Sequence, residues 1–230
     1  MADKRLELAS YFKELERVTL KIVVGFDGFV DEIIHAVDKR MDSANYTRIE
    51  TIEAFAERIA RASGLSTNIE FVPQQIKIGG NGPIMCNALS KHDTTISYIG
   101  ALGYPVMDNV FSDLDDNVET YSIVNPGHTD AVEFHDGKVM LGKMSSLTDL
   151  TYERMIELLG LDKVVELLGD TDLLASVNWS MIPNNTDLWQ KIIKNVLPLL
   201  PKKEQKPFFF VDLADPEKRE NEEIVEALEL

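Results

Sequence analysis

The sequence predicts a single domain of the α/β class, and three features point to it. Short apolar runs at residues 20–24 and 94–99 are each followed by glycine, as the central strands of a parallel sheet often are. Helical patterns separate such runs, for example from Thr51, a candidate cap, to about Ala62. With 230 residues, of which 44% are hydrophobic, the chain can bury one full core.

The overall charge and the cysteine count narrow the class of protein. The chain has 23 basic and 39 acidic residues, a net charge of −16, which argues against attraction to nucleic acid phosphates or anionic lipids. No run reaches the roughly 18 apolar residues that a membrane span needs. The single cysteine, Cys86, excludes a disulfide framework and fits a small core residue in a reducing compartment. We therefore expect a cytoplasmic protein with no nucleic acid or membrane partner.

The first elements lead to a candidate ligand crevice. Residues 4–17 predict an amphipathic helix packed on the core, and residues 20–24 a central strand. Asp27 and Asp31 follow this strand, on the side where open α/β sheets bind ligands. Residues 32–37 are expected to form a strand that leaves the main sheet. His35 lies four residues after Asp31, but no third ligand is near in sequence, so no metal site is predicted.

A glycine-rich stretch, residues 79–82, joins an apolar run to a predicted helix. Its three glycines in four positions let other groups approach the backbone closely. Asn81 is expected to cap the helix with its side-chain oxygen, so that the exposed amides face outward toward a polar ligand. The alternative is a tight turn in which the glycines serve geometry alone.

The middle of the chain predicts an inserted flap. Residues 131–135 and 138–142 flank Asp136 and Gly137, and Asp-Gly between alternating residues is the strongest short hairpin signal. Residues 119–143 are therefore expected to be antiparallel, either as a flap or as an edge extension of the sheet.

Alternating strands and helices resume after residue 148. Residues 172–177 and 207–213 predict strands, the second very apolar, and residues 186–196 predict a helix between them. Thr151 is expected to cap an earlier helix that Gly160 closes. No linker or internal repeat divides the sequence, so we treat residues 1–230 as one domain.

Five segments, taken in order, resemble ribokinase-like (PfkB) carbohydrate kinases. They read GFDGFVD, GGNGPIMCNALSKHD, IGALG, HDGKV and FVDLADPEKR. The resemblance covers the N-terminal two-thirds of such a kinase. It implies a three-layer αβα fold with a small antiparallel β-flap, whose elements fall near residues 30–40 and 119–143. In the family this flap acts as a lid and often as a homodimer interface.

The resemblance also implies an activity, its cofactors and a set of site residues. The activity is phosphorylation of a hydroxymethyl group on a sugar or related alcohol, with ATP and Mg²⁺. By position, Asp31 matches the acid that binds substrate hydroxyls, and Gly80 and Asn81, beside Gly79, match the pair that touches the sugar. Asp27 competes for the role of the acid, because the family's preceding glycine is displaced by one position here. We favour Asp31.

The family's strongest motif, a C-terminal D-T-x-G-A-G-D segment, does not occur in this sequence. In the family it supplies the phosphate-binding amides and the catalytic aspartate. We therefore expect a substrate-binding part of a longer kinase, inactive alone, and assign no catalytic residue. The alternative is a non-catalytic sugar-binding or regulatory module with a kinase-like core. A nucleotide-binding oxidoreductase is not favoured, because the glycine stretch lacks G-x-G-x-x-G spacing.

Overall fold

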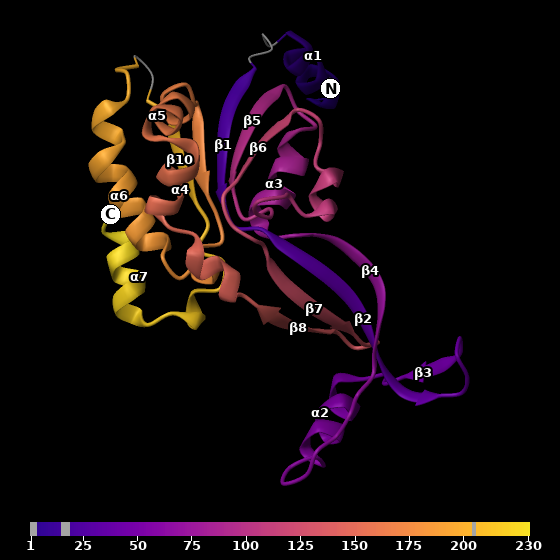
Figure 1. Ribbon diagram of the computed structural model, residues 1–230. Coiled ribbons are helices and arrows are strands. Elements are labelled where there is room, and N and C mark those ends of the chain that lie inside the picture. The colour runs from indigo at the N-terminus through magenta and orange to yellow at the C-terminus, as the bar shows by residue number, and fades with distance from the viewer. Residues whose placement is uncertain (1–3, 15–18, 204–205) are drawn as a thin grey trace.

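The computed structural model describes residues 4–14, 19–203 and 206–230, and its strands form two sheets (Figure 1). The first sheet has the order β10-β9-β1-β5-β6, and all its neighbouring strands are parallel. Its strands are β1 Leu20–Phe26, β5 Thr94–Gly100, β6 Val118–Ser122, β9 Leu173–Ser176 and β10 Phe208–Val211. The predicted strands at residues 20–24, 94–99, 172–177 and 207–213 thus all lie in one parallel sheet.

Helices cover both faces of the first sheet. The α-helices in the described residues are α1 Lys4–Glu14, α2 Ile52–Ala60, α3 Asn81–Leu89, α4 Tyr152–Leu159, α5 Leu161–Gly169, α6 Asn185–Asn195 and α7 Asn221–Leu228. Of these, α2 packs on the second sheet, described below, and not on the first. Alternate side chains of β1 point to opposite faces, as in any strand. Val23 packs in the core beneath α4 to α7, whereas Ile22 and Val24 pack with Cys86 beneath α3 (Figure 1). The three-layer αβα arrangement is therefore confirmed, and so is the core position of Cys86.

The second sheet projects from one end of the first and carries α2 at its far end (Figure 1). Its order is β3-β2-β7-β8, and β4 pairs with β2. The strands are β2 Phe29–Arg40, β3 Tyr46–Arg48, β4 Phe71–Gly79, β7 Gly127–Glu133 and β8 Lys138–Lys143. The predicted hairpin is confirmed, because β7 and β8 are antiparallel around residues 136 and 137.

One expectation about this region is wrong. Residues 119–143 are not antiparallel throughout, since β6 pairs in parallel with β5 in the first sheet. The second sheet is mixed, because β7 runs parallel to β2. The reason is geometric: β1 and β6 leave the first sheet at the same edge, so the strands that follow them run in the same direction. The Gly127 backbone N–H, which donates to the Gly28 carbonyl oxygen at 2.8 Å, joins them at this exit.

The two predicted helix caps whose partners lie close in sequence, Thr51 and Thr151, are confirmed. The hydroxyl of Thr51 accepts from the Ala54 N–H at the start of α2, and that of Thr151 accepts from the Arg154 N–H at the start of α4. The first helix departs from expectation: Leu8 is 54% exposed on α1, so it does not pack on the core. Residues 15–17 of that predicted helix lie outside the described residues.

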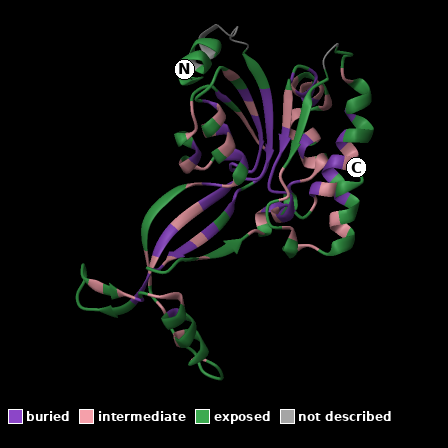
Figure 2. Ribbon diagram, turned by 180° about the vertical axis from the view of Figure 1, so that it is seen from behind, coloured by how far each residue is buried: buried purple, intermediate pink, exposed green. Residues whose placement is uncertain are grey.

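The edge strand β10 has the apolar sequence FFFV, yet all its residues are exposed, the class coloured green in Figure 2. Phe208 is 69% exposed, Phe209 58% and Phe210 47%. In a parallel sheet the strands are normally covered on both faces. Within the part of the chain that the structure describes, β10 pairs with β9 on one edge and with no strand on the other.

Candidate functional site

The candidate site lies where the two sheets meet. The strands β1, β9 and β10 all end at one edge of the first sheet, and this is the edge where open α/β sheets bind ligands. The glycine stretch at residues 79–82 ends β4 and begins α3 at the same place. Asp27 follows β1, and Asp31 lies on β2. Both aspartates contact this stretch, so the structure brings together all five residues that the sequence singles out.

Asp27 is fully buried, at 0% exposure, and accepts hydrogen bonds from distant parts of the chain. Its Oδ2 atom accepts from the Asn81 backbone N–H at 2.7 Å and from the Asn178 side-chain amide at 2.6 Å. Its Oδ1 atom accepts from the Gly82 backbone N–H at 2.8 Å. Asp27 therefore satisfies the first amides of α3 and joins them to the segment after β9.

These contacts correct the expected cap of α3. Asn81 does not cap the helix: the N-cap position is Gly80, and it makes no side-chain cap bond. A carboxylate at a helix N-terminus satisfies the free amides and interacts favourably with the helix dipole, and Asp27 takes that place. The amides of Asn81 and Gly82 consequently point inward to Asp27. The prediction that they face an external polar ligand is wrong.

The glycines of the loop make room for the two aspartates. A Cβ atom at Gly80 would lie 2.8 Å from Asp27 Oδ2, and one at Gly82 would lie 2.8 Å from Asp27 Oδ1. A Cβ atom at Gly79 would overlap the carboxylate of Asp31. Gly80 also has a φ of +89°, which side chains rarely adopt. The groups that approach the glycine backbone closely thus include the protein's own carboxylates, those of Asp27 and Asp31.

The environment of Asp27 opposes its charge. Burial raises its pKa to about 6, although the hydrogen bonds from Asn178, Gly82 and Asn81 act to lower it. The nearby carboxyl group of Asp212 raises it further. Asp27 therefore changes its charge in the range between pH 5 and pH 7.

Asn178 and Asp212 extend this hydrogen-bonded cluster. Asn178 has a left-handed backbone with a φ of +62°, and its N–H donates to Asp212 Oδ2 at 3.2 Å. The Asn81 side-chain amide donates to the same oxygen at 2.6 Å. Sequence reasoning assigned no site role to Asp212. The predicted strand, residues 207–213, includes Asp212, whereas β10 ends at Val211, directly before it. The available signal was a carboxylate near the carboxyl end of a predicted strand.

Asp31 differs from Asp27 because it is only partly buried. It lies in register with Thr129 on β7 and Lys77 on β4. The Thr129 hydroxyl interacts with the Asp31 carboxyl group. Burial raises the pKa of Asp31, while this interaction and the charges of Lys77 and Lys138 act to lower it. An accessible carboxylate with this support can accept hydrogen bonds from ligand hydroxyls.

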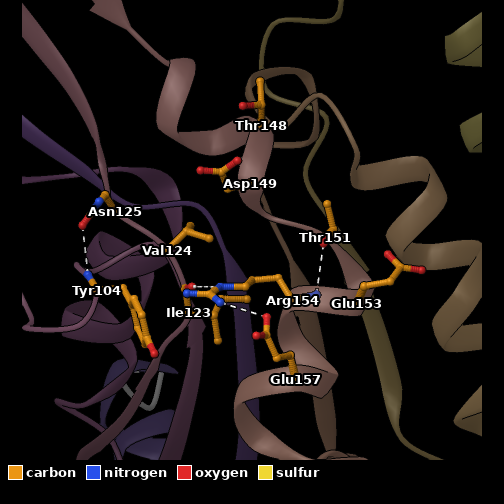
Figure 3. Close-up of a pocket in the computed structure, with 10 residues that line it drawn as sticks. All are labelled: Tyr104, Ile123, Val124, Asn125, Thr148, Asp149, Thr151, Glu153, Arg154 and Glu157. Carbon is orange, nitrogen blue, oxygen red and sulfur yellow. Dashed lines mark hydrogen bonds and ion pairs between the residues drawn. The ribbon is translucent and has the colours of Figure 1, made fainter.

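A cavity of about 680 Å³ lies elsewhere, at the ends of β5 and β6 and the start of α4 (Figure 3). Its lining residues are Tyr104, Ile123, Val124, Asn125, Thr148, Asp149, Thr151, Glu153, Arg154 and Glu157. The Arg154 guanidinium lies 4.4 Å from the centre of the Tyr104 ring, and it pairs with Glu157 at 2.9 Å. None of the five predicted residues lines this cavity. We place the candidate site at the aspartates, because polar groups from both sheets converge there.

Within residues 4–14, 19–203 and 206–230, no group of three or more His, Cys, Asp or Glu side chains is arranged to hold a metal ion. In the same residues, no helix has the length and apolar character needed to cross a membrane.

Similarity to solved structures defines the class of fold. The chain superposes on a carbohydrate kinase from Agrobacterium tumefaciens with a TM-score of 0.54 and 14% identity, covering 87% of this chain and 55% of that one. Adenosine kinase from Schistosoma mansoni gives a TM-score of 0.54 at 14% identity, covering 93% and 60%. Ribokinase from Giardia lamblia gives 0.52 at 16% identity, covering 92% and 55%. The fold is that of the ribokinase-like carbohydrate kinases.

Sequence similarity places the chain within this class. Residues 13–229 match the model of the prokaryotic ketohexokinase family, and the chain belongs to that family of sugar kinases. Ketohexokinase from Haloferax volcanii is 29% identical over 182 residues, which are 78% of this chain and 48% of that protein. The chain thus spans about half the length of this curated relative.

Proposed function

We propose that the whole protein phosphorylates a hydroxymethyl group of a ketohexose, with ATP and Mg²⁺, and that this chain supplies the sugar-binding part. The family assignment supports a sugar kinase, and the name of the relative from Haloferax volcanii points to ketohexoses. We also propose a cytoplasmic location, which the notably acidic composition and the single buried cysteine fit.

The observation that carries the proposal is the setting of Asp31. Its carboxyl group is partly exposed, lies next to the backbone of Gly79, which has no side chain, and interacts with the hydroxyl of Thr129. A carboxylate can accept hydrogen bonds from two sugar hydroxyls, and the backbone of Gly80 and the side chain of Asn81 lie beside it at the start of α3. We propose Asp31, Gly79, Gly80 and Asn81 as sugar-binding residues. The buried Asp27 is excluded from direct contact with the sugar in this proposal.

The part of the reaction assigned to this chain is binding and orientation. Phosphoryl transfer depends chiefly on positioning the acceptor hydroxyl and on stabilising the charge of the phosphate oxygens. ATP supplies the phosphoryl group when it is bound. The described residues do not form a metal-holding cluster. We therefore assign no Mg²⁺ ligand and no catalytic residue to this chain.

A homodimer through the second sheet is a further part of the proposal. In the described residues β4 pairs on one side only, with β2, and Ile76 on β4 is 56% exposed. An unpaired edge with exposed apolar side chains is a natural template for another chain. Sedimentation velocity tests this: we expect a dimer for the wild-type chain and a monomer for Ile76→Glu. A wild-type monomer at micromolar concentration would contradict it.

Calorimetry with D-fructose tests sugar binding. We expect the wild-type chain to bind, and Asp31→Asn to weaken binding at least tenfold, because a hydrogen bond to a charged group contributes about 1.5–3 kcal/mol. Glu32→Gln is the matched control: it removes the same charge from the neighbouring position, which points to the other face of β2. No fructose binding by the wild type, or equal binding by Asp31→Asn, would count against the proposal.

A non-catalytic sugar-binding or regulatory module is the second candidate. It fits a kinase-like core in which no D-T-x-G-A-G-D segment occurs among residues 1–230. Incubating the chain with ATP, Mg²⁺ and D-fructose separates the candidates. ADP formation that requires fructose would support an enzyme in this chain, whereas fructose binding without turnover would support the module.

A further inference from the structure

We propose that Asp27 is the positioning residue of the sugar site, whose buried carboxylate locks the start of α3 and the segment after β9 into the arrangement that binds sugar. This inference rests on the proposed function, because it concerns how Gly80 and Asn81 are held in place. Asp27 itself does not touch the sugar, since it is 0% exposed.

The first argument is connectivity. Asp27 lies between β1 and β2, its partners Asn81 and Gly82 begin α3, and its partner Asn178 follows β9. One carboxylate therefore joins both sheets and one helix. Asn81 is held twice, because its backbone N–H donates to Asp27 and its side chain donates to Asp212. The loop that would contact the sugar is thus fixed from inside the protein.

The second argument is the chemistry of the partners. All three groups that reach Asp27 are N–H donors, two at Oδ2 and one at Oδ1. An ionised carboxylate has acceptor sites for all three. A protonated carboxyl or an asparagine at this position would turn a hydrogen toward one of these donors and lose that bond. The arrangement therefore depends on the charge of Asp27 as well as on its shape.

The third argument concerns the charged and titratable groups around Asp27. Those that act on it electrostatically, or on which it acts, are Asp212 after β10, Tyr98 on β5 and Cys86 on α3. Burial raises the pKa of Cys86 to about 12 and that of Tyr98 well above its ordinary value, so both stay neutral near pH 6. None of these groups offers a positive charge. Acidification through pH 6 is therefore expected to protonate Asp27 and to loosen the start of α3.

Nuclear magnetic resonance tests the lock without any sugar. In ¹⁵N spectra of the chain between pH 5 and pH 8, we expect the amides of Asn81 and Gly82 and the side-chain amide of Asn178 to shift together, with one midpoint near pH 6. Asp31→Asn should keep this transition, and Asp27→Asn should abolish it. A wild-type chain in which these amides do not titrate, or an Asp27→Asn variant in which they still do, would overturn the proposal.

A second variant covers the case in which Asp27→Asn does not fold. Asn178→Gly removes one donor but suits the left-handed backbone at this position, where φ is +62°. Because the Asn178 hydrogen bond lowers the pKa of Asp27, its loss should move the midpoint of the Asn81 and Gly82 amides above that of the wild type. An unchanged or lower midpoint would contradict the proposal that Asp27 holds the start of α3 through this hydrogen-bonded cluster.

Titration with D-fructose at pH 7.5 then links the lock to binding. We expect Asp27→Asn to bind fructose at least tenfold more weakly than the wild type, although its side chain is remote from solvent. Wild-type affinity in a folded Asp27→Asn variant would overturn the positioning role and leave the proposed function intact. If the wild type binds no fructose while the three amides titrate with Asp27, the proposed function fails and the role of Asp27 in holding the loop is supported.

Discussion

Two aspartates four residues apart, Asp27 and Asp31, occupy opposite environments. Asp27 closes the edge of the first sheet, is fully buried and has all its partners within the protein. Asp31 begins the second sheet, is partly exposed and has acceptor capacity left for a ligand. From this contrast we propose that one acid builds the site and that the other faces the substrate.

Removing the side chain of each acid should separate their structural roles most strongly. Asp27→Ala leaves three buried N–H donors without an acceptor, so we expect a loss of about 3–4 kcal/mol in the free energy of unfolding. Asp31→Ala should cost about 1 kcal/mol or less, because its surroundings include solvent. Urea unfolding at pH 7 measures both. Equal losses for the two variants would contradict the division.

The pH dependence of stability should also differ between the two acids. The pKa of Asp27 rises from an ordinary value of 3.8 to about 6 on folding. Because the folded pKa is raised, the contribution of Asp27 to stability is fully present below about pH 4 and is lost as the pH rises through 6. At about 1.4 kcal/mol per pKa unit, the loss is up to about 3 kcal/mol.

Unfolding free energies at pH 4.5, 6 and 7.5 test this sign. Relative to Asp27→Asn, the wild-type chain should lose stability as the pH rises, while Asp31→Asn should follow the wild type closely. Protonation of Asp27 is expected to raise the free energy of unfolding, because burying a neutral carboxyl group costs less than burying its anion. It is also expected to loosen the start of α3 locally, because the protonated group loses a hydrogen bond from one of its three N–H donors. A wild-type advantage over Asp27→Asn that grows with pH would contradict the buried setting of Asp27.

Substituting a glycine that packs against Asp27 should lower the free energy of unfolding more than substituting a glycine with open space around it. A Cβ atom at Gly82 would lie 2.8 Å from both Asp27 Oδ1 and a ring carbon of Tyr98, so we expect Gly82→Ala to lose about 2–3 kcal/mol. Gly64→Ala is the control, since its Cβ would meet no atom within 4 Å and only its φ of +78° opposes the change, at about 1 kcal/mol. Thermal unfolding of both variants measures the two losses of stability. Equal losses would show that the loop tolerates a side chain beside Asp27.

The smallest expected effect is at the partner of Asp31. Thr129→Val removes the hydroxyl that holds the Asp31 carboxyl group but keeps a similar shape. We expect fructose affinity to fall by about threefold to tenfold, since a hydrogen bond of this kind contributes about 1 kcal/mol, with a similar or smaller change in stability. Calorimetry at pH 7.5 measures the affinity. An affinity loss larger than that of Asp31→Asn would show that Thr129, and not Asp31, makes the main contact.

The sequence predicted the local parts of this fold well, for reasons that are themselves local. Thr51 and Thr151 cap their helices by accepting a hydrogen bond from an N–H group three residues further along. The Asp136-Gly137 turn likewise joins two strands that are adjacent in sequence, β7 and β8. Strands β1 and β5 were recognisable because apolar runs followed by glycine suit buried parallel strands. The resemblance of ordered motifs then placed the chain among the sugar kinases.

The parts that were missed depend on contacts between distant residues. The cap of α3 is Asp27, 54 positions before Asn81, and the side-chain amide that completes it belongs to Asn178, 151 positions further along than Asp27. No local pattern distinguishes Asp27 from Asp31, because their burial is decided by what the chain packs over them. The parallel pairing of β6 was missed for a similar reason: its partner β5 precedes it by a long loop.

A fructose titration followed by ¹⁵N spectra tests the central claim most directly. We expect D-fructose to shift the amides of Asp31, Gly79, Gly80 and Thr129 in a saturable way, and to leave the lining of the cavity in Figure 3, such as Asn125, unchanged. Saturable shifts confined to that cavity, or no saturable shift at all, would contradict the placement of the sugar site at Asp31.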